Sequence, residues 1–223
     1  SAEDPYPDYS PAMIARPEHV ALALEAAEKS AVLIKNTGLL PLKKSARIGV
    51  FGRLATLENT GDNGSSRVRP PTHVTALDGL ANYLGNPLKL AGDEKDIAAA
   101  AAAARGLDAC ILVLGTTAKE EGEFIPGDLG NEQAAASGGD ESGALGGTFD
   151  RGGDRERLRL PEDQRALLDA VSKANPNTMV VLVCGSAILC DFAPNVAAIL
   201  QTFYSGMEGG TALARLLYGD VNP

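Results

Sequence analysis

Three glutamates, Glu120, Glu121 and Glu123, lie within four residues of one another shortly after an apolar segment. Residues 109–114 read Ala-Cys-Ile-Leu-Val-Leu, a composition that predicts a buried parallel strand. In open α/β sheets the functional sites lie in loops at the carboxyl ends of the strands, and the polar, glycine-rich segment that follows here is long. A carboxyl group placed there can give and take protons. We therefore expect one of the three glutamates to be a catalytic acid/base.

The same cluster has two other interpretations. An acidic cluster on a loop is most often a solvated surface. Carboxylates can also hold a cation, although their spacing here matches no regular ligand pattern. Neighbouring carboxylates oppose each other's ionisation, which would suit an acid that keeps its proton near neutral pH.

Helical and strand patterns alternate through the rest of the chain. We predict helices over residues 17–36, 74–84, 93–105, 161–174 and 209–218, and strands over 47–51, 88–90, 109–114, 178–183 and 196–201. Residues 1–16 contain three prolines and predict an extended lead-in, which leaves 17–223 as one domain. The alternation predicts an α/β fold, a three-layer α/β/α sandwich. Its mainly parallel sheet should have about five or six strands, with helices on both faces.

Charge and hydropathy exclude several classes of partner. The chain has 20 Lys and Arg against 29 Asp and Glu, a net charge of −9, so we expect neither nucleic acid nor membrane as a partner. No apolar run approaches the roughly 20 residues that a membrane span needs. The acidic, proline-rich start is not a signal peptide, and any leader would precede residue 1. Localisation therefore stays open, with the free cysteines slightly favouring the cytoplasm.

The cysteines and histidines predict no metal site. Cys110 and Cys184 lie in apolar strand patterns, and the spacing to Cys190 matches no metal motif, so buried free thiols are the favoured interpretation. His19 falls on the first predicted helix and His73 at a junction between loop and helix. Both are interpreted as surface or packing residues.

A glycine-rich loop over residues 61–71 follows the strand at 47–51. Loops of this kind can hold phosphates, but this one has neither a Gly-x-Gly-x-x-Gly pattern nor a Gly-Lys-Ser/Thr ending. We therefore expect no nucleotide and no cofactor of any kind.

Seven motifs together resemble a known domain. They are Ser-Ala-Val-Leu-Ile-Lys-Asn at 30–36 with Leu-Pro-Leu at 40–42, the loop at 61–71, the glutamates at 120–124, Gly-Asp-Arg-x-x-Leu-x-Leu-Pro at 153–161, Asn-Pro-Asn-Thr-Met-Val-Val-Leu at 175–182, Tyr-Ser-Gly-Met-Glu-Gly-Gly at 204–210, and Tyr-Gly-Asp-Val-Asn-Pro at 218–223. In this order they resemble the C-terminal α/β-sandwich domain of glycoside hydrolase family three. That family contains β-glucosidases and β-xylosidases.

The resemblance implies half of an active site. Retaining glycosidases use two carboxyl groups, a nucleophile and an acid/base. In this family the nucleophilic Asp lies on an N-terminal barrel domain, which this chain lacks and which would be its partner. The Gly-Glu-aromatic order favours Glu123 as the acid/base, with Glu121 as the runner-up. The implied substrate is a β-linked oligosaccharide or an aryl or alkyl β-glycoside.

Further residues near the site have expected roles. The resemblance places the loop at 61–71 beside the sugar, where Ser66 and Arg67 are expected to contact the leaving-group side of the substrate, or merely to tie down their loop. Asp154 and Arg155 are expected to be structural, through an ion pair or a contact at the helix entry. Glu208, at the start of the last helix, is interpreted as structural as well.

The sequence departs from the family pattern in places. Phe192 and Met207 stand where relatives often have Trp and Gln, and the segment 127–148 is longer than in many relatives. These departures bear on how Glu123 is positioned and not on its identity as the expected acid/base.

Two functions of other classes remain as alternatives. One is a noncatalytic carbohydrate-binding or interdomain scaffold module. The other is a flavodoxin-like domain that binds a small ligand.

Overall fold

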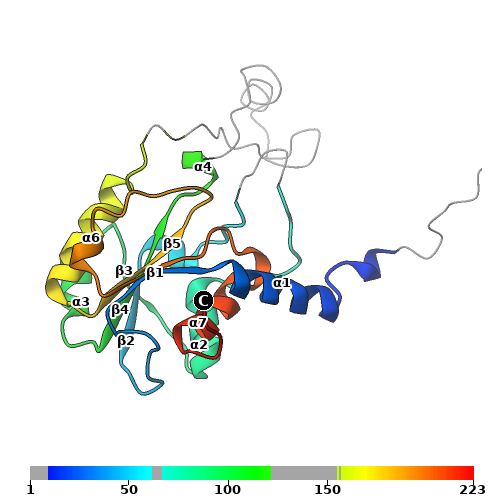
Figure 1. The fold of residues 1–223 in the computed structure, drawn as a ribbon, viewed down its shortest axis with the longest axis horizontal. Coiled ribbons are helices and arrows are strands. Elements are labelled where there is room, and N and C mark those ends of the chain that lie inside the picture. Colours follow the sequence, from blue (N-terminus) through cyan, green and yellow to red (C-terminus); the bar gives the residue numbers. More distant parts are fainter. Residues whose placement is uncertain (1–9, 62–66, 122–154, 156) are drawn as a thin grey trace, which may run out of the picture.

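The computed structural model describes residues 10–61, 67–121, 155 and 157–223. Six strands form one sheet in the order β1-β6-β5-β4-β2-β3 (Figure 1). They are β1 (Val32–Asn36), β2 (Ile48–Phe51), β3 (Leu90–Gly92), β4 (Ala109–Gly115), β5 (Thr178–Val183) and β6 (Ala198–Gln201). The helices are α1 (Pro17–Ser30), α2 (Ala76–Leu84), α3 (Ile97–Ala104), α4 (Ala118–Glu121), α6 (Glu162–Ala174) and α7 (Gly209–Leu217). Within these described residues, no helix has the length and apolarity needed to cross a membrane.

The predicted three-layer sandwich is confirmed. On one face of the sheet, α2 and α7 bury an apolar cluster that includes Leu80, Leu213 and Leu217. On the other face, α3 and α6 bury a second cluster that includes Leu167 and Leu168. Figure 1 shows the two pairs of helices on opposite sides of the strands. Strand β4 is buried along its whole length, because a central parallel strand packs against helices on both faces.

The prediction of one helix over 17–36 is wrong for its last six residues, 31–36. Helix α1 ends at Ser30, and residues 32–36 form edge strand β1, which pairs antiparallel with β6. The helical spacing of apolar residues continues by coincidence through Ala31 to Ile34. The branched side chains of Val32 and Ile34 nevertheless favour a strand. Pairing with β6 decides the outcome, because Leu33 then packs on the core.

Other element boundaries differ from prediction by a few residues. Strand β3 lies at 90–92 rather than 88–90, and α3 begins at Ile97 rather than 93. Helix α2 begins after Thr75, whose side-chain oxygen accepts a hydrogen bond from the backbone N–H of Asp78 at 3.2 Å. Thr75 is therefore the N-terminal cap of α2.

The five parallel strands run in the order β3-β2-β4-β5-β6. Counted along the chain without β1, this order is 2-1-3-4-5, that of flavodoxin-like sheets. From β2 the chain crosses to β3 on one side, and from β4 it crosses to β5 on the other side. The connections after β2 and β4 therefore diverge, and such a divergence leaves a crevice at the carboxyl ends of the strands.

Candidate active site

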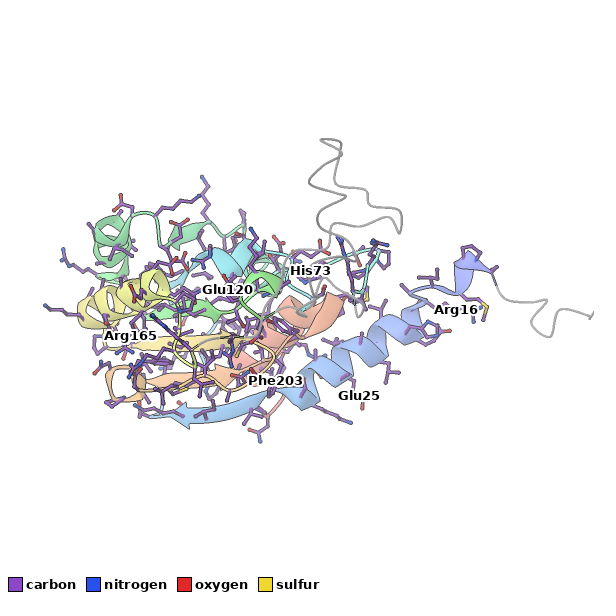
Figure 2. All side chains as sticks on the ribbon, turned by 90° about the horizontal axis from the view of Figure 1, so that it is seen from above. Arg16, Glu25, His73, Glu120, Arg165 and Phe203 are labelled. Atoms are coloured by element: carbon purple, nitrogen blue, oxygen red, sulfur yellow. The ribbon has the colours of Figure 1, made fainter. Side chains whose placement is uncertain are left out.

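The candidate site lies at this divergence between β2 and β4. The segment after β2 leads towards residues 61–71, and the segment after β4 forms the short helix α4 with two of the three glutamates. The two segments are joined directly, because the side-chain amide of Asn59 donates a hydrogen bond to the carbonyl oxygen of Thr116 at 2.9 Å. In Figure 2, which looks down from above, Glu120 marks α4, and Phe203 marks the segment that follows β6.

Only some of the predicted site residues belong to the part of the chain that the structure describes. Glu123, Ser66 and Asp154 lie outside the described residues. Glu121 and Arg155 are described, and the structure brings them together although their sequence positions are far apart. Arg67 is described, and it is exposed. In the sequence it comes directly after residues 62–66, which lie outside the described residues.

A buried glutamine holds the end of β4. The side chain of Gln164, in α6, donates to the carbonyl oxygen of Gly115 at 2.9 Å and accepts from its backbone N–H at 2.8 Å. Gly115 has a φ of 147° and lies so close to β5 that a Cβ would be 1.9 Å from the carbonyl oxygen of Val183. The chain therefore leaves β4 at a defined place, immediately before α4.

Glu121 lies at the centre of a polar cluster, which also contains Arg155, Gly185, Ser186 and Tyr204. Its Oε1 accepts hydrogen bonds from the Tyr204 hydroxyl at 2.5 Å and from the backbone N–H of Gly185. Its Oε2 lies 3.2 Å from Nε of Arg155 and 3.5 Å from Oγ of Ser186. The side chain is only 9% exposed. Glu121 is therefore not a solvated surface carboxylate.

Arg155 is the positive partner in this cluster. Its side chain is 10% exposed, and its Nη2 donates hydrogen bonds to Ser186 Oγ and to the carbonyl oxygen of Ala187, both at 2.6 Å. Guanidinium groups suit such sites because they offer several donors in a rigid plane. Arg155 thus ties α4 to the segment that follows β5.

Tyr204 completes the cluster from the segment after β6. Burial and the hydrogen bond to Glu121 both raise the pKa of its hydroxyl, so the tyrosine stays a neutral donor. Its ring lies against two glycines: a Cβ on Gly61 would approach the ring to 3.1 Å, and one on Gly185 to 3.0 Å. A side chain larger than hydrogen at either glycine would therefore displace Tyr204.

Glu120 has a local role. Its Oε2 accepts from the backbone N–H of Thr117 at 2.8 Å and from the Thr117 hydroxyl at 2.6 Å. The prediction of an acidic loop is thus wrong for residues 118–121, which form helix α4. The carboxylate of Glu120 stabilises the first turn of that helix, where acidic groups are electrostatically favoured.

A mostly apolar pocket opens on the α2 and α7 side of the same strand ends. Its lining includes Leu57, Asn59, His73, Thr202 and Phe203. Phe203 has a φ of 55°, a conformation that costs energy for a bulky residue. His73 lines the pocket, so it is not simply a surface residue, whereas His19 is exposed on α1.

The thiols and the helix-start glutamate fit their structural interpretations. Cys110 and Cys184 are buried, and burial raises the pKa of the Cys110 thiol to about 11 and also raises that of Cys184. A neutral buried thiol is a poor nucleophile and a poor metal ligand. Glu208 precedes α7 and accepts a hydrogen bond from the Thr211 hydroxyl at 2.7 Å. In the described part of the chain, no three side chains of His, Cys, Asp or Glu gather as metal ligands.

The sequence indicates no role for Gly185 or Ser186, and its one signal for Tyr204 is that this residue begins the motif at 204–210. Gly185 and Ser186 follow β5, and only the adjacency of the ends of β4 and β5 in the sheet reveals that they reach Glu121.

Comparison with protein families and with curated proteins agrees on one assignment. The family model described as the glycosyl hydrolase family 3 C-terminal domain matches residues 31–223. Among curated relatives, a β-xylosidase from Formosa agariphila is 32% identical over 224 residues, and thermostable β-glucosidase B from Acetivibrio thermocellus is 33% identical over 211 residues. Each alignment covers 92% of this chain but only 27% and 25% of the respective relative. The chain thus spans roughly a quarter of the length of these relatives.

Solved structures share the fold. A β-glucosidase from Bifidobacterium adolescentis aligns with a TM-score of 0.70 at 30% identity, covering 92% of this chain and 27% of that one. A β-glucosidase from Listeria innocua, solved with isofagomine, aligns with a TM-score of 0.75 at 26% identity, covering 99% of this chain and 28% of that one.

Proposed function

Because this chain belongs to the glycoside hydrolase family 3 C-terminal domain family, we propose that it is the acid/base-bearing domain of a retaining, exo-acting β-glycosidase. It acts together with an N-terminal barrel domain that carries an Asp nucleophile. The family match from residue 31 to residue 223 carries this proposal. The strand order alone would not, since flavodoxin-like sheets support many unrelated functions.

The proposed reaction has two steps. The barrel Asp attacks the anomeric carbon while Glu123 gives its proton to the departing glycosidic oxygen. Glu123 then removes a proton from water, and that water releases the sugar from the Asp with the original β configuration. The substrate is a terminal β-linked sugar on an oligosaccharide, or an aryl or alkyl β-glycoside. Ser66 and Arg67 would meet the leaving group through hydroxyl and guanidinium donors.

The contacts of Glu121 favour Glu123 over the runner-up. Among the described residues, each partner of Glu121 presents a hydrogen atom or a positive charge to the carboxylate. Glu121 therefore serves as a hydrogen-bond acceptor in these contacts. A general acid needs the opposite, a proton directed at the substrate.

The proposal is tested by comparing this chain with the full-length protein on 4-nitrophenyl β-glucoside and 4-nitrophenyl β-xyloside. We expect the full-length protein to release nitrophenol and the isolated chain to release none, because the chain contains only one of the two carboxyl groups. Proton NMR of the first product should show the β-anomer. Turnover by the chain alone, or the α-anomer as first product, would contradict the proposal. Inactivity of the full-length protein would favour a noncatalytic module.

A further inference from the structure

We propose that Glu121, Arg155 and Tyr204 are positioning residues for the protonation step: together they fix the end of α4, and through it the general acid. This inference rests on the proposed function, because it needs Glu123 to be that acid. None of the three would touch the substrate. They would act by limiting where the acid can be.

The ion pair between Glu121 and Arg155 joins the two residues that stand on either side of segment 122–154 in the sequence. Their side chains are 9% and 10% exposed, so solvent and salt screen the attraction weakly. Breaking such a pair leaves a buried charge without compensation, which is far more costly than breaking a surface pair. The pair thus holds both residues in place against the segment after β5.

Glu121 restricts Glu123 through the covalent chain. Two residues of extended backbone span at most about 7 Å between Cα atoms, so anchoring Glu121 confines the attachment point of Glu123 to a small volume. The Glu121 carboxylate is held by three partners: the guanidinium of Arg155, the backbone N–H of Gly185 after β5, and the hydroxyl of Tyr204 after β6.

Tyr204 adds a link to the other half of the site. Its hydroxyl donates to Glu121 and lies 3.3 Å from the hydroxyl of Thr116. Its ring packs against Gly61, the last described residue before the segment that contains Ser66. One side chain therefore contacts both Glu121, at the end of α4, and Gly61, in the segment that follows β2.

The expected consequence of loosening this cluster is selective. Misplacing a catalytic group by about 1 Å can cost up to about 100-fold in rate. The loss should appear only when the leaving group needs a proton. Dinitrophenolate departs from a 2,4-dinitrophenyl β-glycoside as a stable anion. The alcohol that departs from an alkyl β-glycoside must be protonated as the bond breaks.

The test uses the full-length protein with Tyr204→Phe and Arg155→Lys, which keep the ring and the charge respectively. We expect kcat/KM for an alkyl β-glycoside to fall about 10-fold or more, and kcat/KM for the dinitrophenyl β-glycoside to fall less than about 2-fold. Tyr83→Phe and Arg157→Lys are matched controls. Tyr83 bonds to Asp220, and Arg157 pairs with Glu162 on the surface, so neither substitution should change this ratio.

A double-mutant cycle separates positioning from general destabilisation. In a Glu123→Ala background, Tyr204→Phe should cause no further loss with the alkyl substrate, because the group that it positions is gone. Equal losses with both substrates, or losses that add fully to those of Glu123→Ala, would overturn the inference and leave the proposed function standing. If Glu121→Gln, rather than Glu123→Ala, shows the behaviour of a missing acid, Glu121 is itself the catalytic group. The positioning role of Glu121 would then be wrong.

Discussion

Replacing Glu123 by alanine in the full-length protein is expected to lower kcat/KM for alkyl β-glycosides about 1,000-fold, within the range for loss of a general acid. The dinitrophenyl β-glycoside should keep a nearly normal kcat/KM, because its leaving group needs no proton. Its kcat should fall, because the glycosyl-enzyme intermediate loses the base that activates water. Steady-state kinetics with both substrates measure these effects.

Azide gives the discriminating measurement. Azide is already an anion and attacks the glycosyl-enzyme without a base, so it should restore kcat of Glu123→Ala with the dinitrophenyl substrate and yield a β-glycosyl azide. Glu120→Ala is the control from the same group of three glutamates. Azide should not accelerate hydrolysis by this variant, because the Glu120 side chain bonds only to Thr117 among described residues. Azide rescue of Glu121→Ala but not of Glu123→Ala would move the acid/base to Glu121.

Replacing Gly79 by alanine is expected to lower the free energy of unfolding by at least about 2 kcal/mol, an effect of forced overpacking. A Cβ on Gly79, in α2, would lie 2.0 Å from the carbonyl oxygen of Gly210 in α7. Backbone atoms cannot rotate away as a side-chain end can, so the two helices must separate. Helix propensity predicts the opposite sign, because alanine in a helix is favoured over glycine by roughly 1 kcal/mol.

Urea unfolding of the chain, read as the shift of the transition midpoint, checks this expectation. Asn82→Ala is the matched control, since Asn82 is exposed on the same helix and should gain at most about 0.5 kcal/mol from propensity. A Gly79→Ala variant as stable as the parent would mean that α2 and α7 do not meet backbone to backbone.

Much of the fold could be predicted because its signals are local. The apolar segments that became β4 and β5 are continuous and short, and each is bounded by turn residues, which is typical of buried parallel strands. Thr75 caps α2 through a hydrogen bond to a residue three positions away. The alternation of these elements then predicts a sandwich, because helices in the crossover connections cover both faces of a parallel sheet.

The boundary at Ser30 could not be predicted in the same way. Helical spacing extends past it, and only pairing with β6, which lies far along the chain, turns residues 32–36 into a strand. Long-range contacts override local propensity wherever the two are of similar strength.

For the site, the residue types and the presence of three carboxyl groups after β4 can be read directly from the sequence. The role of Glu121 depends instead on its tertiary contacts. Its partners Arg155, Ser186 and Tyr204 follow in later parts of the chain, and the sheet brings them together because β5 and β6 end beside β4. A carboxylate's role depends on the donors and charges around it, and those neighbours exist only after the chain has folded.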